Sequence, residues 1–364
     1  MRKFLSFRDF DWVLFGFVMA ISILGVMQIY SASANTKFLG VHTKQMYWLL
    51  AGVLAMFVVS IVDYHFLVEK SHWAYIGSIL ALLAVFAVGV TALGAKRWIR
   101  VPGIGLFQPS EWVKLVMIIV VARYFASLNQ REVSWPDILK GIALVGVPLL
   151  MVLKQPDLGT SLTYLPPLFV GLFLGGMKWK HFAVFLIAGL LMAPLAWKFA
   201  LKPYQKDRLV NFVHPENDPK GSGYQIQQSL IAVGNGGVFG KGMSQGTQTQ
   251  GMFLPVTHTD FIFSSFAEEH GFVGATGVLL LYFIVLMRLV QNAQTAPDRV
   301  GAMIIMGVVA IFVFHILVNV GMVIGMMPVT GIPLPLMSYG GSSVMFTFLA
   351  LGLVMNIRMR RFVN

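Results

Sequence analysis

Long apolar runs separated by short polar segments make up most of this chain. A run of about 20 apolar residues is the length that an α-helix needs to cross the hydrocarbon core of a bilayer. By that criterion the pattern predicts about ten membrane-spanning helices. Their expected ranges are 12–32, 46–63, 74–94, 111–128, 138–153, 158–176, 181–200, 262–288, 301–326 and 341–357. We therefore expect an all-α polytopic membrane protein, organised as a single transmembrane domain over residues 1–364.

One long polar segment interrupts this pattern between the seventh and eighth predicted helices, at about residues 201–260. It is rich in Gly, Gln, Asn and Pro, and it closes on His258, Thr259 and Asp260 just before the apolar pattern resumes. Segments of this length inside a compact fold are usually functional. The segment therefore places a carboxylate, that of Asp260, at the mouth of a membrane helix.

Composition agrees with a membrane protein, because 57% of the residues are hydrophobic, 12% are charged and the mean hydropathy is +0.75. The chain has no cysteine, which excludes disulfides and thiolate metal sites. Its histidines form no HExxH or HxxxH pair, which argues against zinc. The first apolar run lacks a small-residue cleavage site, so we expect a retained helix and not a signal peptide.

Two other functional classes find no support in the pattern. No internal repeat is visible, so the chain lacks the signature of an inverted-repeat transporter. The glycine-rich stretch 234–242 is not a nucleotide-binding phosphate loop, because Asn235 replaces the required first glycine and Gly242 replaces the Ser or Thr after Lys241. A turn after a short amphipathic helix near 224–233 is the better interpretation. Despite the net charge of +12, nothing indicates nucleic-acid binding.

Basic residues near the helix ends predict the orientation in the membrane. Both tails and the turn between the sixth and seventh helices are basic, which places the two termini in the cytoplasm and the long loop outside. Several cations then fall on the outer side. They are Lys37, Lys44, Lys96, Arg97, Arg100 and Lys114. Contact with anionic headgroups explains any single one of them, whereas a cluster suggests a binding site.

The strongest outer cluster opens the fourth predicted helix. Glu111 and Lys114 are three residues apart and share a helix face, and Ser110 is the expected N-cap. The segment is either a helix start with a local ion pair or a phosphate-binding corner beside an acid. Asp157 and Asp260 are likewise expected to cap the helices that follow them, and capping is compatible with a catalytic role.

The segment from Asn319 to Ser343 reads NVGMVIGMMPVTGIPLPLMSYGGSS and resembles the signature of the SEDS family, the shape, elongation, division and sporulation proteins. The resemblance continues through nearly the whole chain. Its further motifs are GAKRW at 94–98, FQPSEWVKL at 107–115, QPDLGTSL at 155–162, GSGYQIQQS at 221–229 and QGTQTQGMFLPVTHTDFIFSSFAEEHGFVG at 245–274. Within the family, the short N-terminal tail and the QGTQTQ segment are more similar to the elongation member, RodA, than to the division member, FtsW.

The resemblance implies a peptidoglycan glycosyltransferase of the bacterial cytoplasmic membrane that joins lipid II units and releases undecaprenyl pyrophosphate. Asp260 matches the family's essential aspartate and is the expected catalytic base. The expected substrate-binding residues are Lys96, Arg97, Gln108, Glu111, Lys114, Asp157, His258 and Ser338. The leaving pyrophosphate would be stabilised by these cations or by a divalent cation, Mg or Mn, near Glu111 and Asp157.

The resemblance also implies partners and leaves rival functions open. Lipid II, the nascent glycan strand and a class B penicillin-binding protein, a transpeptidase, are the expected partners. The long loop is expected to act as a lid and acceptor platform, with Ile226, Leu230 and Val233 on one side of its short helix. The alternatives are a lipid II flippase, the division paralogue, or a scaffold that anchors a partner enzyme.

Overall fold

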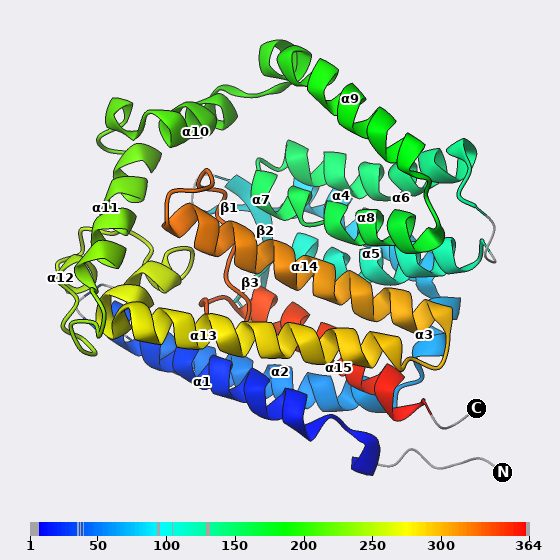
Figure 1. Ribbon diagram of the computed structural model, residues 1–364, viewed down its shortest axis with the longest axis horizontal. Coiled ribbons are helices and arrows are strands. Elements are labelled where there is room, and N and C mark those ends of the chain that lie inside the picture. Colours follow the sequence, from blue (N-terminus) through cyan, green and yellow to red (C-terminus); the bar gives the residue numbers. More distant parts are fainter. Residues whose placement is uncertain are drawn as a thin grey trace.

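The computed structural model describes residues 7–34, 36, 38, 40–92, 95–103, 105–128 and 132–361. Lys37 and Gly94, both named above, lie outside these residues. The long helices lie side by side as a bundle, and both termini are at one end of it (Figure 1). The main helices are α1 (Trp12–Ser33), α2 (Val41–Ile61), α4 (Ser71–Val88), α5 (Pro109–Ala126), α6 (Trp135–Lys154), α7 (Leu158–Leu162), α8 (Leu165–Gly175), α9 (Trp179–Leu195), α13 (Ile262–Gln294), α14 (Arg299–Val323) and α15 (Gly341–Met359).

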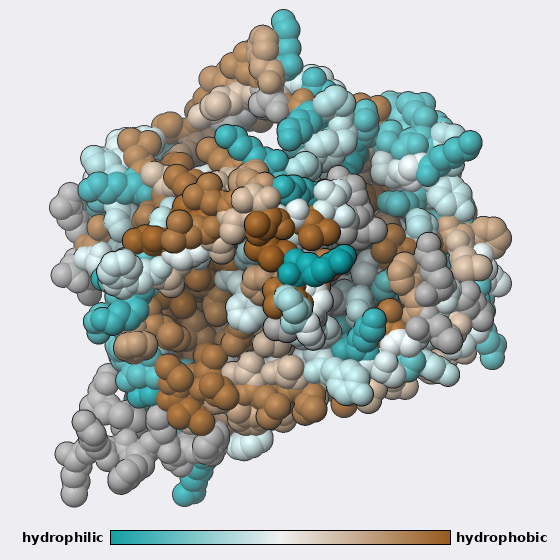
Figure 2. All heavy atoms as spheres, turned by 180° about the vertical axis from the view of Figure 1, so that it is seen from behind, coloured by the Kyte–Doolittle hydropathy of each residue, from teal (hydrophilic) through white to brown (hydrophobic). Residues whose placement is uncertain are grey.

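Within the described residues, nine helical segments are long and apolar enough to cross a membrane, and they match nine of the ten predicted spans. The remaining predicted span, the fourth, is α5, which carries Glu111, Lys114 and Arg123 within its 18 residues. Seen from behind, apolar side chains gather over the middle of the molecule and polar ones mainly towards its ends (Figure 2). The prediction of a polytopic all-α membrane protein is confirmed.

A small sheet, which the sequence analysis did not predict, follows α4. The third span was expected to reach residue 94, but the helix ends at Val88 and the chain turns into strand β1 (Val90–Ala92). β1 pairs antiparallel with β2 (Ala95–Val101), and β2 pairs antiparallel with β3 (Gly105–Phe107). The apolar run continued into a β-branched segment, so hydropathy alone could not show where the helix ended.

The long loop is mostly helical and lies at the end of the bundle away from the termini (Figure 1). It contains α10 (Pro203–Val213), a short 3₁₀ turn (Pro215–Asn217), α11 (Ser222–Asn235) and α12 (Thr247–Gln250). α11 confirms the predicted short helix, but its buried face holds Ile226, Ser229 and Ala232, whereas Leu230 is exposed. The Ser229 hydroxyl donates to the carbonyl of Val323 at 2.7 Å, which explains why a polar residue lies on the packed face.

Two glycines let α15 pack closely along α2. A Cβ added at Gly352 would lie 2.7 Å from the carbonyl oxygen of Met56, and one at Gly52 would lie 2.9 Å from the ring of Phe348. Small residues at helix contacts allow the close approach that favours association in membranes. In the same region Gly341, in the first turn of α15, lies against the Trp48 ring. Gly341 thus serves helix packing.

α13 is interrupted at Gly271, where φ is +65° and ψ is −167°. The break frees peptide N–H groups that would otherwise bond within the helix. The N–H of Phe272 donates to the carbonyl of Gly237 at 2.9 Å, and that of Val273 donates to the carbonyl of Val238 at 3.1 Å. The loop is thereby joined by its backbone to the interrupted helix.

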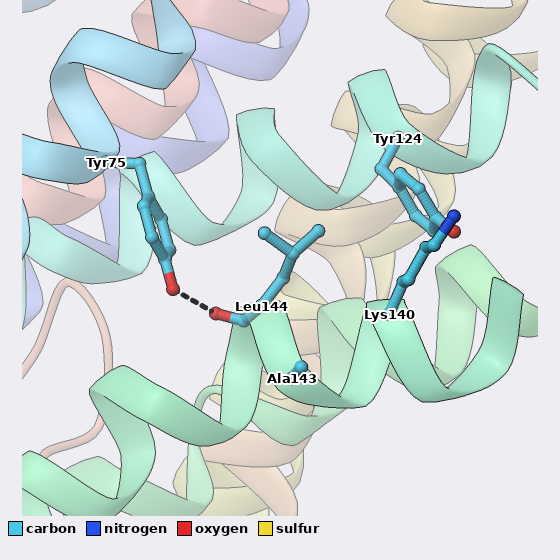
Figure 3. Close-up of a pocket in the computed structure, with 5 residues that line it drawn as sticks. All are labelled: Tyr75, Tyr124, Lys140, Ala143 and Leu144. Carbon is cyan, nitrogen blue, oxygen red and sulfur yellow. Dashed lines mark hydrogen bonds between the residues drawn. The ribbon is translucent and has the colours of Figure 1, made fainter. Parts of the chain in front are cut away.

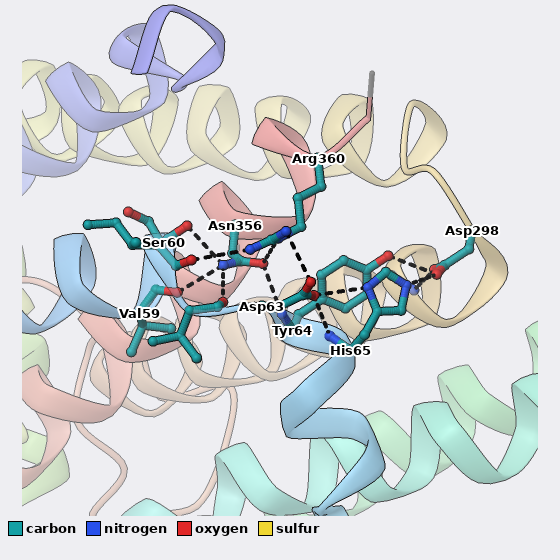
Figure 4. A network of polar contacts seen from close by, with 11 residues as sticks. Val59, Ser60, Asp63, Tyr64, His65, Asp298, Asn356 and Arg360 are labelled. Carbon is teal, nitrogen blue, oxygen red and sulfur yellow. Dashed lines mark hydrogen bonds and ion pairs between the residues drawn. The ribbon is translucent and has the colours of Figure 1, made fainter. Parts of the chain in front are cut away.

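A polar network closes the end of the bundle that carries the termini (Figure 4). Asn356 of α15 is fully buried, and its amide donates to the carbonyls of Val59, Ser60 and Val62 at the end of α2. Its amide oxygen accepts from the N–H of Tyr64 at 3.2 Å. One side chain therefore satisfies the carbonyl end of α2 and the start of α3 (Tyr64–Glu69), which otherwise lack helical partners.

We expect Asn356→Ala to destabilise the protein. The change leaves several buried backbone groups without partners, and each such group costs about 1–3 kcal/mol. The measurement is the thermal unfolding midpoint of the detergent-solubilised protein. The exposed Asn217→Ala is the matched control and is expected to leave the midpoint unchanged; equal midpoints for both variants would contradict the role of Asn356.

Candidate functional site

Asp260 lies in the turn that joins the long loop to α13, and its side chain is partly buried. It does not cap α13 as expected, because the N-cap is Phe261 and makes no side-chain cap bond. The backbone carbonyl of Asp260 is held by the amide of Asn319, which donates to it at 2.9 Å and to the carbonyl of Ile332 at 2.8 Å. The carboxylate is therefore positioned through its backbone and is not used for capping.

Gly331 lies directly against this carboxylate. Its φ is +73°, a conformation that side-chain-bearing residues rarely adopt, and a Cβ added there would lie 3.5 Å from Oδ2 of Asp260. Glycine at this position keeps the approach to the carboxylate free of a side chain.

Two arginines and one acid set the electrostatics of Asp260. Burial raises the pKa of its carboxyl group above the ordinary range, whereas the charges of Arg97 and Arg208 and a hydrogen bond with Thr259 oppose the rise. The charge of Asp157 raises the pKa further. Asp260 is thus a partly buried acid that two cations help to keep ionised.

Arg97 is positioned by an irregularity in the small sheet. Val90 pairs with Trp98 and Thr91 with Lys96, so Arg97 is the extra residue of a β-bulge. Bulges re-aim side chains, often next to active sites. The Arg97 guanidinium lies 3.3 Å from Asp157 and stacks on the Trp98 ring at 4.3 Å, and within the described part of the chain its buried Nε has no partner.

Asp157 brings three segments together. As expected, it caps α7 by accepting from the N–H of Thr160 at 3.1 Å. Its other oxygen accepts from the Gln108 amide at 2.9 Å, and Gln108 also reaches the Ser110 hydroxyl at 3.2 Å. Gln108, and not Ser110, is the N-cap of α5, since Pro109 occupies the first helical position. The expectation for Ser110 was wrong by two residues.

Glu111 and Lys114, where a local ion pair or a phosphate-binding site was expected, form a buried ion pair. The Lys114 ammonium is fully buried, lies 2.8 Å from the Glu111 carboxylate and sits over the Phe346 ring at 4.3 Å. Nδ1 of His315 is 3.0 Å from the carbonyl of Pro333, so it carries the proton, which leaves Nε2 to accept from Lys114 at 3.5 Å. Removal of either partner would leave the other as an unpaired buried charge, which is strongly destabilising.

Lys96 has a different environment from its neighbour Arg97. Its ammonium donates to the carbonyl of Phe86 at 2.6 Å and also reaches that of Ala87 at 3.4 Å, at the end of α4. Cations commonly satisfy the last carbonyls of a helix. The structure therefore brings Arg97, Gln108 and Asp157 together and leaves Lys96 at the α4 terminus.

His258 and Ser338 fasten the turn that carries Asp260. The carbonyl of His258 accepts from the N–H of Tyr339 at 2.9 Å, and the Ser338 hydroxyl donates to the carbonyl of Thr259 at 2.7 Å. Burial lowers the pKa of the His258 imidazole, whose ring lies 5.8 Å from that of Tyr339. These two contacts hold the backbone of the two residues that precede Asp260.

Two residues of α10 that the sequence did not single out, Tyr204 and Arg208, face this site. The charge of Arg208 opposes the rise in the pKa of Asp260. Its guanidinium lies 6.0 Å from the centre of the Tyr204 ring. Burial raises the pKa of Tyr204, and the charges of Arg208, Asp157 and Arg97 also act on it. No motif identified these residues, although Pro203 marks the start of the helix that carries them.

No group of three or more His, Asp or Glu residues that could hold a metal ion occurs within the described ranges. Glu111 and Asp157 belong to separate ion pairs, with Lys114 and Arg97 respectively. These two carboxylates therefore do not form a ready cation site in this arrangement.

Glu268 and Glu269, further along α13, hold the loop in place. The Glu268 carboxylate accepts from the backbone N–H groups of Gln248 and Thr249 at 2.8 and 3.0 Å. Glu269 accepts from the Ser31 hydroxyl at 2.5 Å, which ties α13 to α1. Both acids are buried, and their partners account for their burial.

The fold and this cluster define a polytopic helical membrane protein with a partly buried acid and two arginines beneath a long helical loop. The model of the FtsW/RodA/SpoVE family, described as cell cycle proteins, matches residues 10–362. The chain belongs to this family, which confirms the resemblance read from its motifs.

Individual relatives and solved structures support the same family assignment. The peptidoglycan glycosyltransferase MrdB of Escherichia coli (strain K12) is 40% identical over 347 residues, covering 93% of this chain and 92% of that protein. The peptidoglycan glycosyltransferase RodA of Treponema pallidum is 34% identical, covering 97% of this chain and 98% of that protein. The crystal structure of the rod shape determining protein RodA of Thermus thermophilus is similar with a TM-score of 0.73 and 31% identity, covering 97% and 98% of the two chains.

A further similar chain belongs to a peptidoglycan synthase complex in which polymerization and crosslinking are coordinated. Its TM-score is 0.83 at 33% identity, with 97% of this chain and 98% of that chain covered. The family, the fold and the names of the relatives therefore all indicate a peptidoglycan glycosyltransferase.

Proposed function

We propose that this chain polymerises lipid II and that Asp260 is its catalytic base. The chain is a peptidoglycan glycosyltransferase of the cell-elongation type, as its relatives named MrdB and RodA are. The observation that carries the assignment of the base is the environment of Asp260, a partly buried acid on which the charges of Arg97 and Arg208 act.

In the proposed reaction, the Asp260 carboxylate takes the proton of the 4-hydroxyl of the acceptor GlcNAc. The freed oxygen attacks the anomeric carbon of the donor MurNAc, and the bond from that carbon to the pyrophosphate oxygen breaks. The configuration changes from α to β, and undecaprenyl pyrophosphate leaves with the bonding electrons. A carboxylate within hydrogen-bond reach of an attacking hydroxyl is the usual arrangement for glycosyl transfer with inversion.

Arg97 and Arg208 would serve two purposes. They oppose the rise in the pKa of Asp260, which keeps the base ionised, and they offer fixed positive charge to the leaving pyrophosphate. Arg97 approaches from β2 and Arg208 from α10, so the substrate would lie between the sheet and the loop. Lys114 is fully buried and paired with Glu111.

A divalent cation near Glu111 and Asp157 stays a prediction. The two acids are each paired with a protein cation, so the residues present do not fit a shared ion in this arrangement. We derive no step of the reaction through such an ion.

We propose that α10, α11 and α12 act as the lid and acceptor platform. α10 supplies Tyr204 and Arg208 to the site, and the Glu268 carboxylate anchors α12. Gly237 and Gly240, both with positive φ, form part of the segment that connects α11 to α12.

The proposed setting is a bacterial cytoplasmic membrane with both termini inside and the site outside. The basic residues of the C-terminal tail support this orientation, since Lys and Arg accumulate on the cytoplasmic side. We further propose a class B penicillin-binding protein as the partner, because a similar chain acts within a peptidoglycan synthase complex.

Lipid II translocation is the rival function, since a charged site within a membrane protein would also suit a flippase. A second alternative is that this chain is the division paralogue, because relatives named FtsW are 32–34% identical to it. A passive scaffold would not need a partly buried acid between two arginines.

We expect Asp260→Asn to lower the rate of lipid II polymerisation by about 10²–10⁴-fold, the usual contribution of a general base. The measurement is glycan-strand formation from purified lipid II by the full-length protein with its cognate transpeptidase. Asp207→Asn, an exposed acid on α10, is the matched control and should keep full activity. Polymerisation by a folded Asp260→Asn protein at the wild-type rate would remove Asp260 from the mechanism, and loss of translocation in the same variant would favour the flippase.

The acidic limb of the pH–rate profile should respond to Arg208. Since the base works only when ionised, activity falls as the pH drops through the raised pKa of Asp260. Arg208→Gln removes a charge that lowers this pKa, so the limb should move to higher pH. The readout is kcat/KM against pH, with Lys206→Gln on the same helix as the control. A shift towards lower pH, or an equal shift in the control, would contradict the assignment.

A further inference from the structure

A cavity of about 510 Å³ opens between α4, α5 and α6, far from Asp260. Tyr75, Tyr124, Lys140, Ala143 and Leu144 line it (Figure 3). Tyr124 lies 13 residues after Glu111 on α5, which separates the cavity from the ion pair by roughly 20 Å along the helix. The cavity lies towards the end of the bundle that carries the two termini, because Tyr75 is near the start of α4, Tyr124 near the end of α5 and Lys140 near the start of α6.

A proline explains how the wall of this cavity is built. Pro148 in α6 has no N–H, so the carbonyl of Leu144, four residues earlier, loses its helical partner. The Tyr75 hydroxyl of α4 donates to that carbonyl at 2.9 Å (Figure 3). The Tyr124 hydroxyl of α5 donates to the carbonyl of Asp137 at 3.2 Å. Both tyrosines thus hold α6 by its backbone and present their rings to the cavity.

Lys140 is the charged group of this cavity. With both tyrosine hydroxyls occupied, the ammonium is the group left to recognise a polar ligand. Lys140 is exposed, lies beside Tyr124 in Figure 3, and makes no ion pair or hydrogen bond with any residue that the structure describes. Its nearest acid in sequence, Asp137, is taken up by the backbone and hydroxyl of Ser134.

We propose that this cavity binds an anionic phospholipid of the leaflet next to the termini, with an acyl chain against the two tyrosine rings and the phosphate at Lys140. The lining is apolar apart from the ammonium, which matches a lipid with a charged headgroup and not a soluble phosphate. Long basic side chains near helix ends extend towards the membrane interface, and basic pockets between membrane helices on the cytoplasmic side hold anionic headgroups.

Neighbouring charge agrees with an anionic ligand. Arg123, one residue before Tyr124, donates to the carbonyls of Val68 and Glu69 and to the Ser71 hydroxyl, all at 3.0 Å. The guanidinium adds positive charge at the same end of the bundle, where the Glu69 carboxylate also lies within its electrostatic range. A zwitterionic lipid would bring its own cation to this region and would gain less.

The chain has no cysteine, so a single Ala143→Cys variant carries one thiol inside the cavity. We expect added phosphatidylglycerol to slow maleimide labelling of this thiol in detergent solution, whereas phosphatidylcholine with the same acyl chains should not. Adding Lys140→Gln should raise the phosphatidylglycerol concentration needed for half-protection about fivefold, since one cation near an anionic headgroup contributes about 1 kcal/mol. Lys140→Arg should restore the wild-type concentration.

Two controls on α9 complete the experiment. Ala183→Cys places a thiol on an exposed helix face outside the cavity, and it should be labelled equally with either lipid. Lys180→Gln removes an exposed cation near the start of α9 and should leave protection of the Ala143→Cys thiol unchanged. Equal protection by the two lipids, or protection that Lys140→Gln does not weaken, would overturn the proposal and leave only a non-selective lipid contact. Thermal unfolding of each variant separates a lost site from a lost fold.

Discussion

The interior of this protein depends on one constraint: a bilayer provides no water, so each polar group within the helices must find its partner in the protein. Lys114 illustrates it. Its ammonium is fully buried, and Glu111, His315 and the Phe346 ring surround it. Three helices, α5, α14 and α15, contribute to this one environment. The buried charge of Lys114 therefore connects α5 to α14 and α15.

The same constraint organises both ends of the bundle. At the end with the termini, Asn356 satisfies backbone groups of α2 and α3. At the other end, Asn319 joins the turn of Asp260 to the segment that holds Ile332. Each amide donates to carbonyls at a helix end or in irregular backbone, and so each allows the chain to leave a helix without losing hydrogen-bond partners. The candidate site lies where such irregular segments meet.

The helices could be predicted because apolar length is a direct physical requirement of a membrane. Asp260, Arg97, Gln108 and Asp157 could be singled out as well, by charge in an apolar context and by the family motifs, and the structure places them close together. The caps at Ser110 and Asp260 could not be assigned correctly, because adjacent residues compete for the same helix start. Arg208 was missed because a charged residue in a polar loop has no distinguishing pattern; only the fold of α10 brings it to the site.

The break at Gly271 has a consequence for how α13 should be understood. Residues before the break hold α12 and α1 through Glu268 and Glu269, while residues after it form the long apolar part of the helix. The carbonyls of Gly237 and Val238 cover the exposed N–H groups at the break itself. The first turns of α13 are therefore mechanically part of the loop, and the pivot between loop and membrane lies inside what looks like one continuous helix. A side chain introduced at Gly271 would overlap the backbone of Gly240. The substitution would therefore displace a segment that lies about thirty residues earlier in the chain.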